Sequence, residues 1–169
     1  MILNGIQMIR TSILDQIMCF ITSLGNGGWI WLVLFLALFI YPKTRKLSFV
    51  LLAALVLDAV STTVLKHCIQ RIRPCDVNTS IQLLISRPHD YSFPSGHTSI
   101  SFAAVTILYF AHKKNLFKIS FVLAILIAFS RLYLYVHYPT DVLAGMLVGF
   151  GCGFIVWEIS TLYLTVLEV

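Results

Sequence analysis

The stretch ISFVLAILIAFSRLYLYVHYPTDVLAGMLVGF, residues 119–150, decides the fold. Two apolar runs flank a short segment, SRLYLYVHYPTD (residues 130–141), which carries Arg131, His137 and Asp141. Apolar runs of this kind are typical of membrane-spanning helices. We therefore predict spans over about residues 119–135 and 140–164. Charged residues left beside such spans indicate a functional site.

The composition extends this interpretation to the whole chain. Of 169 residues, 59% are hydrophobic and 11% are charged, and the mean hydropathy is +0.90, whereas soluble domains carry about 25% charged residues. We predict one integral membrane domain over residues 1–169. The net charge of +5 does not indicate a nucleic-acid partner, because the basic residues fall in short loops between spans. The four cysteines lack the CxxC spacing of a zinc site, and we expect no metal or other cofactor.

Three further spans are predicted, over about residues 29–41, 47–65 and 98–111. The expected fold is an all-α, polytopic membrane helix bundle of about five transmembrane helices. Residues 1–24 place apolar groups at helical spacing, which predicts an amphipathic N-terminal helix lying in the membrane interface. A helix packed against the bundle is the alternative. No cleavable signal peptide is expected, because the N-terminus lacks a basic segment and Asp15 interrupts its apolar stretch.

The loops predict the orientation in the membrane. Two short turns, residues 42–46 and 112–118, are rich in lysine and arginine and are separated by two spans. The positive-inside rule therefore places both turns in the cytoplasm. The polar loop 66–96 and the loop 131–139 then share the extracytoplasmic face. We expect a bacterial inner or plasma membrane protein with its active site on that face.

Two more segments have the chemistry of a phosphate site. KHCIQRIRP (residues 66–74) supplies Lys66 and Arg73, which together with Arg131 offer the cations that phosphate oxygens bind. A continuous helix would place Lys66 and Arg73 on one side, because seven residues make about two turns. Taken alone, each is more typical of an interfacial anchor.

PSGH (residues 94–97) precedes a predicted span. Ser95 suits a helix cap, and Gly96 lets a ligand approach the backbone, so the free N–H groups of the helix start can face an anion. Ser95 alone is more often only a cap, and His97 alone an ordinary interfacial histidine.

His137 and Asp141 are four residues apart, with Pro139 suited to the first turn of a helix. In that geometry Asp141 orients the imidazole of His137 and makes it a better nucleophile. His97 can then act as the general acid. The alternative for the pair alone is a capped helix start with a surface histidine. Together with the cations, the pattern predicts phosphoryl transfer through a phosphohistidine without a metal.

The pattern Lys66-x6-Arg73-Pro74, then PSGH, then Ser130-Arg131-x5-His137-x3-Asp141 resembles the type-2 phosphatidic-acid phosphatase superfamily, which also includes the vanadium-dependent haloperoxidases and glucose-6-phosphatase. All eleven signature positions occur in order, and the resemblance covers about residues 24–160. It implies that His137 is the nucleophile, Asp141 its partner and His97 the general acid. It also implies a phosphate site formed by Lys66, Arg73, Ser95, Gly96 and Arg131. Membrane members of this family commonly have six spans, so the chain looks like a short form without the first.

Several polar residues outside the motifs have open roles. Asp58 lies within a predicted span, which indicates a functional group, although a bond to neighbouring serine or threonine is favoured. We expect residues 89–91 to shape the pocket entrance, and Arg71 and Arg87 are candidates for a second phosphate or a lipid head group. Cys68 and Cys75 are expected to face outward, either as a disulfide or, as we favour, unpaired.

A phosphate site at a membrane surface suits a lipid phosphate in the bilayer. The leading hypothesis is hydrolysis of undecaprenyl diphosphate to undecaprenyl phosphate and phosphate, because the small loops leave little for elaborate head-group recognition. Phosphatidylglycerophosphate or phosphatidic acid is the alternative, and a lipid A phosphatase comes next. A vanadate-dependent oxidase and a non-catalytic membrane scaffold or transporter are hypotheses from other classes. The sequence predicts no oligomeric state.

Overall fold

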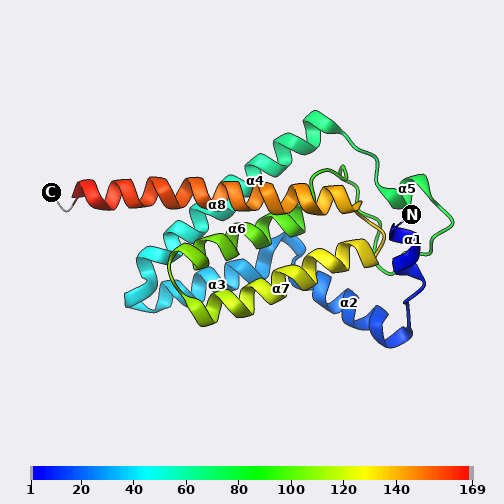
Figure 1. The fold of residues 1–169 in the computed structure, drawn as a ribbon, viewed down its shortest axis with the longest axis horizontal. Coiled ribbons are helices and arrows are strands. Elements are labelled where there is room, and N and C mark those ends of the chain that lie inside the picture. Colours follow the sequence, from blue (N-terminus) through cyan, green and yellow to red (C-terminus); the bar gives the residue numbers. More distant parts are fainter. Residues whose placement is uncertain (1, 168–169) are drawn as a thin grey trace.

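The computed structural model of the protein describes residues 2–167, and for residues 163–167 it describes the backbone alone. Within residues 2–167 every regular element is helical. The helices that run along the bundle are α3 (Trp29–Ile40), α4 (Arg45–Ile69), α6 (Gly96–Phe110), α7 (Lys114–Tyr133) and α8 (Pro139–Leu167). Figure 1 shows them side by side, so the predicted all-α membrane bundle is confirmed.

The five predicted spans correspond to these five helices, but they differ in length. Helices α4, α7 and α8 are each long enough and apolar enough to cross a membrane. The bent pair α2 (Ser12–Leu24) and α3 passes the same test together, with a 46° angle between its halves. At 15 residues α6 is shorter than the roughly 20 residues of a full span. The structure thus contains three clear spans, or four if the bent pair is one.

The N-terminal segment differs from the single amphipathic helix predicted over residues 1–24. It forms two helices, α1 (Ile2–Gln7) and α2, because Thr11 caps the second helix by accepting the N–H of Leu14 at 3.2 Å. One face of α2 is buried at Met18 and Thr22, whereas Ile13 is 72% exposed. The buried face of α2 packs against the bundle, and its location in the membrane interface stays a prediction.

A glycine turn sets the bend between α2 and α3. Gly27 and Gly28 have φ values of +57° and +70°, in the left-handed region that glycine adopts without strain. They lie in the short helical turn η1 (Asn26–Gly28). The turn brings α2 back toward α7 and places Asn26 beside the start of α6.

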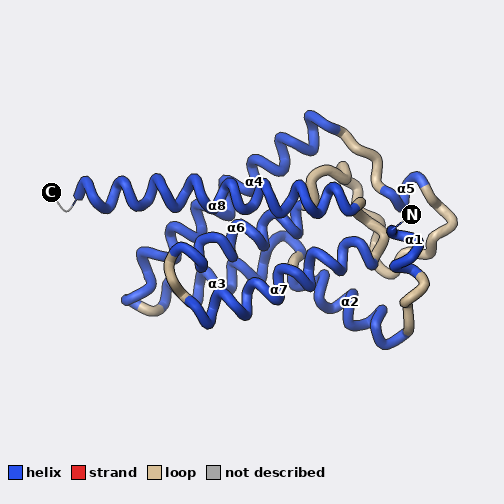
Figure 2. Tube along the Cα trace, in the orientation of Figure 1, coloured by secondary structure: helices blue, strands red, loops and turns tan. Residues whose placement is uncertain are grey.

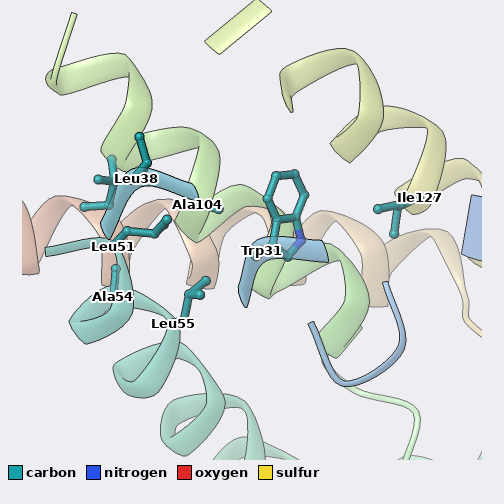
Figure 3. Close-up of a cluster of buried hydrophobic side chains, with 8 residues drawn as sticks. Trp31, Leu38, Leu51, Ala54, Leu55, Ala104 and Ile127 are labelled. Atoms are coloured by element: carbon teal, nitrogen blue, oxygen red, sulfur yellow. The ribbon is translucent and has the colours of Figure 1, made fainter. Parts of the chain in front are cut away.

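The apolar core joins α3, α4, α6 and α7. Trp31 is 1% exposed and lies among aliphatic side chains of this cluster, which Figure 3 shows from one side. Its indole Nε1 donates to Ser101 Oγ at 3.1 Å, so the one polar atom of this large ring is satisfied within the core. The contact fixes α3 against α6.

Helices α6 and α8 approach each other through glycines. Gly145, Gly149 and Gly153 recur every four residues on α8, so they share one face of the helix. A Cβ on Gly149 would lie only 2.1 Å from the backbone oxygen of Ser99, and one on Gly145 2.7 Å from that of Ser95. Small residues at such an interface let two membrane helices pack backbone to backbone.

The polar loops gather at one end of the bundle. The turn η2 (Pro42–Thr44) and the α6–α7 turn lie at the opposite end from α1, α5 (Pro74–Val77) and the loops around α5, as Figures 1 and 2 show. The starts of α6 and α8 and the ends of α4 and α7 point toward the end with the long loops. The three motif segments therefore meet on one face, as the sequence predicted.

Candidate active site

Six of the eight predicted site residues line one cavity of about 520 Å³. These six residues are Lys66, Arg73, Gly96, His97, Arg131 and His137. The other two, Ser95 and Asp141, lie behind the cavity wall, and both are fully buried. Residues 71 positions apart in the chain, from Lys66 to His137, thus form a single site.

The first motif reaches the cavity by a different route from the one expected. A continuous helix from Lys66 to Arg73 was wrong, because α4 ends at Ile69 and Gln70 adopts a left-handed φ of 50°. Lys66 lies in the last turn of α4, and Arg73 precedes Pro74, the first residue of α5. The chain turns sharply between them, and both side chains still converge on the carboxylate of Asp90.

Arg73 is the most extensively bonded cation of the site, and its side chain is 3% exposed. It donates to the backbone oxygens of Asp90 and Val136 at 2.8 and 2.7 Å, and to Asp90 Oδ1 at 2.7 Å. Its Nη1 also lies 3.1 Å from His137 Nε2. The guanidinium is therefore held rigidly against the ring of His137.

This contact determines the tautomer of His137. A guanidinium can only donate, so Nε2 must be the unprotonated nitrogen, and Nδ1 carries the hydrogen. Burial lowers the pKa of His137 to about 3, while Asp141 opposes this shift and Arg131 and Arg73 reinforce it. The imidazole is consequently neutral near pH 7, and in this structure the lone pair of Nε2 accepts the Arg73 N–H.

Asp141 lies on the other side of that ring. Its Oδ2 is 3.5 Å from His137 Nδ1, which is long for a hydrogen bond but close enough to orient the ring. Oδ2 accepts Ser92 Oγ at 2.5 Å and the backbone N–H of Tyr138 at 2.9 Å. The last bond is of the capping-box type, since Asp141 is in the first turn of α8 and Tyr138 precedes that helix. The predicted His–Asp pair is thus built into the start of α8.

Arg71 acts on Asp141 and does not line the cavity. Its Nη1 is 2.7 Å from Asp141 Oδ1 and 2.6 Å from Thr140 Oγ1, and its guanidinium stacks on the Tyr138 ring at 4.1 Å. The structure therefore gives Arg71 no place beside a second phosphate. Arg87, the other candidate, does line the cavity at its edge, where it pairs with Asp76 at 3.1 Å.

The PSGH segment forms the start of α6. Ser95 occupies the cap position but its hydroxyl does not cap the helix; it bonds to Thr98 Oγ1 at 3.0 Å. Its backbone N–H donates to the backbone oxygen of Asp141 at 3.0 Å, which ties α6 to α8. A Cβ on Gly96 would meet nothing within 4 Å, so the backbone there faces open space, as predicted. His97 projects into the cavity, with Nε2 2.9 Å from Asn26 Oδ1.

Arg131 is buried at the end of α7, with 3% of its surface exposed. Its Nη1 donates to Thr22 Oγ1 of α2 at 2.5 Å, whereas its Nε has no partner among the described residues. A buried N–H without a partner is costly unless a ligand accepts it. Arg131 therefore has a free donor in the wall of the cavity, which suits an anion.

Asp90 was predicted only as part of the pocket entrance, but its carboxylate lies between the two cations of the first motif. Its carboxylate bridges Lys66 at 3.0 Å and Arg73 at 2.7 Å. Partial burial opposes ionisation, but the two cations lower the pKa of Asp90 to about 2. The bridging carboxylate is therefore ionised at any ordinary pH. His89 also lines the cavity, next to Asp90.

The remaining open roles are settled by contacts outside the cavity. Asp58 accepts a hydrogen bond from Ser99 Oγ, as favoured from the sequence. Cys68 and Cys75 are both free thiols. The expectation that both face outward was wrong for Cys75, which is 1% exposed because it packs in a second apolar cluster with Tyr133 and Val136.

Sequence reasoning missed Ser92, Thr22 and Asn26, which touch Asp141, Arg131 and His97 respectively. Ser92 lies two residues before Pro94, inside the loop already assigned to the site, so its place in the chain was a usable signal. Thr22 belongs to the helix predicted to lie in the membrane interface, and Asn26 to the glycine-rich stretch that follows it; no local pattern in the sequence links either residue to the motifs.

Comparison with known proteins agrees with this geometry. A family model described as the PAP2 superfamily matches residues 46–163. Undecaprenyl-diphosphatase of Sulfolobus acidocaldarius is 34% identical over 149 residues, covering 88% of this chain and 71% of that protein. Phosphatidylglycerophosphatase B of Bacillus subtilis is 34% identical over 163 residues, covering 88% of this chain and 76% of that protein.

A solved structure is similar over nearly its whole length. The crystal structure of Aquifex aeolicus LpxE superposes with a TM-score of 0.81 at 33% identity, and the match covers 93% of each chain. The family-model match spans Lys66, Arg73, the PSGH segment, Arg131, His137 and Asp141. The chain therefore belongs to the PAP2 superfamily and is an integral membrane phosphatase.

Proposed function

We propose that the protein removes the terminal phosphate of an isoprenoid lipid diphosphate, such as undecaprenyl diphosphate, through a phosphohistidine on His137. The observation that carries this proposal is the tautomer of His137, whose unprotonated Nε2 lies at the cavity beside a fixed guanidinium. A neutral imidazole oriented by a carboxylate is a nucleophile once Arg73 turns its N–H from Nε2 to the phosphate oxygens of the bound substrate.

The reaction has two steps. Nε2 of His137 attacks the terminal phosphorus, and the P–O bond to the lipid phosphate breaks. Burial and the neighbouring Arg131 hold the pKa of His97 well below its ordinary value, so His97 is neutral in the empty site. It takes up a proton from solvent when the polyanionic substrate binds, and it donates that proton to the departing oxygen. Water then attacks the phosphohistidine, His97 takes up a proton from it, and the N–P bond breaks to release inorganic phosphate. Lys66, Arg73 and Arg131 stabilise the charge on the phosphoryl oxygens in both steps. Gly96 and the N-terminus of α6 complete the phosphate cradle, and Ser95 supports that helix start from behind the cavity wall.

The number of cations supports a diphosphate. Lys66, Arg73 and Arg131 line the inner part of the cavity, and Arg87 adds a fourth cation among its lining residues. Arg87 is half-exposed, and its partners among the described residues are Asp76 and the backbone oxygen of Cys75. It is thus available to a second phosphate group next to the one that reacts.

Phosphatidylglycerophosphate is the second candidate, because the Bacillus subtilis relative is named for that activity. The decisive experiment measures phosphate release from undecaprenyl diphosphate and from phosphatidylglycerophosphate by purified protein in detergent with EDTA. We expect release from the isoprenoid by the wild type and none by His137→Ala. Much faster hydrolysis of the glycerophospholipid would overturn the isoprenoid assignment, and loss of activity in EDTA would overturn the metal-free mechanism.

We also propose that the site faces the extracytoplasmic side of a bacterial plasma membrane. The support is that both basic turns, residues 42–46 and 112–118, lie at the opposite end of the bundle. Cys68 offers a natural probe, because it is exposed at the site end of α4. In a variant that keeps only Cys68, a membrane-impermeant maleimide should label intact cells; labelling only after lysis would reverse the orientation.

A further inference from the structure

The two cations of the first motif already share an anion within the protein. Asp90 Oδ2 lies 3.0 Å from Lys66 Nζ, and Asp90 Oδ1 lies 2.7 Å from Arg73 Nη2. One carboxylate thus presents one oxygen to each cation, as two oxygens of a phosphate would. The carboxylate is on a loop and 57% of its side chain is exposed, while the cations are 12% and 3% exposed.

Neighbouring backbone groups complete this arrangement. Lys66 Nζ also donates to the backbone oxygen of Tyr91, and Arg73 Nε donates to that of Asp90. The loop of residues 90–91 therefore supplies both cations with acceptors. A phosphate that binds Lys66 and Arg73 must take the place of the Asp90 carboxylate, which can swing toward solvent because it is the exposed partner.

We propose that Asp90 is an intramolecular competitor for the phosphate site, which sets the minimum affinity an anion needs in order to occupy the cavity. The inference rests on the proposed role of Lys66 and Arg73 in phosphate binding. The competitor lowers the apparent affinity of every anion by the same factor, which is the fraction of molecules whose cations are free.

This threshold has a chemical consequence for selectivity in a bilayer. A terminal phosphate carries up to two negative charges, whereas the phosphodiester of an ordinary phospholipid carries one. Phosphodiesters are abundant in the membrane, and open cations would bind them. With Asp90 in place, a phosphodiester monoanion binds too weakly to occupy the cavity. A phosphate dianion binds strongly enough to displace the Asp90 carboxylate. The same competition helps to expel the inorganic phosphate product.

The test is equilibrium binding of inorganic phosphate and of diethyl phosphate, a diester monoanion, to the detergent-purified protein by calorimetry at pH 8. The variants are Asp90→Asn and Asp90→Ala, and Glu158→Gln is the control because it makes the same charge change at an exposed position on α8. We expect both Asp90 variants to bind phosphate about tenfold more tightly or better. Diethyl phosphate binding should become measurable in both, and the control should match the wild type.

Unchanged or weaker phosphate binding in the Asp90 variants would overturn the inference and make Asp90 a residue that positions the cations. Absence of phosphate binding in all four proteins would overturn it as well. The proposed substrate fails separately: a wild type that binds phosphate but hydrolyses no isoprenoid diphosphate would refute that assignment, and the ratio of phosphate affinities would still decide the role of Asp90.

Discussion

The loop end of the bundle and the α6–α8 interface are both densely packed, but different forces hold them. At the loop end Arg73, His137 and Asp141 are buried and stay there through ion pairs and hydrogen bonds. At the α6–α8 interface glycines let two backbones touch. We expect the first region to determine turnover and the second to determine stability.

The largest expected effect is that of His137→Asn. It removes the nucleophile but leaves a polar group for Arg73, so turnover should fall about 10⁴-fold or more while the unfolding temperature stays close to that of the wild type. His67→Asn is the matched control, because His67 is exposed, lies outside the cavity lining and bonds through Nδ1 to the backbone oxygen of Thr63 in its own helix. Steady-state phosphate release and thermal unfolding check both. A variant that unfolds much earlier would show that the site also supports the fold.

Asp141→Asn should have the next largest effect. The amide keeps the shape but loses the charge that faces His137 Nδ1 and pairs with Arg71, so kcat should fall about 10²- to 10³-fold. Asp141 does not line the cavity, and KM should therefore change little. Kinetics on one lipid diphosphate over a range of concentrations separates the two constants. A large rise in KM with normal kcat would place Asp141 in substrate binding instead.

A substitution in the interface between α6 and α8 should lower the stability of the protein and leave its turnover nearly unchanged. In Gly149→Ala the new Cβ would press on the backbone oxygen of Ser99, which cannot move as a side chain can, so the free energy of unfolding should fall by about 1–3 kcal/mol. Gly151→Ala on the same helix is the control, because a Cβ there meets nothing within 4 Å. Turnover per folded molecule should stay within about tenfold. Equal stability of the two variants would contradict the close packing.

The sequence predicted much of this architecture because its signals are local. Apolar runs mark the helices, and Pro139 marks the start of α8, where His137 and Asp141 then fall into place. The motif spacing also predicted six of the residues that line the cavity. The break between α1 and α2 escaped prediction, because the apolar periodicity continues through it while the Thr11 cap decides the local structure.

Long-range polar contacts are what the sequence could not supply. Thr22 meets Arg131 only because the glycine turn folds α2 back, and nothing near either residue indicates the other. For Arg71 the sequence suggested a contact that the structure does not contain. Its position in a phosphate-binding motif suggested a ligand contact, but the turn at Gln70 directs its guanidinium to Asp141.

Arg71 and Arg87 therefore give the smallest and most discriminating prediction. Arg71→Gln should lower kcat about tenfold with KM unchanged, because it weakens the hold on Asp141 without touching the cavity. Arg71→Lys should recover part of the rate through the restored charge. Arg87→Gln should instead raise KM for a diphosphate several-fold at normal kcat, since Arg87 lines the cavity. If Arg71→Gln raised KM as Arg87→Gln does, both arginines would bind the head group, and the division between positioning and binding residues at this end would be wrong.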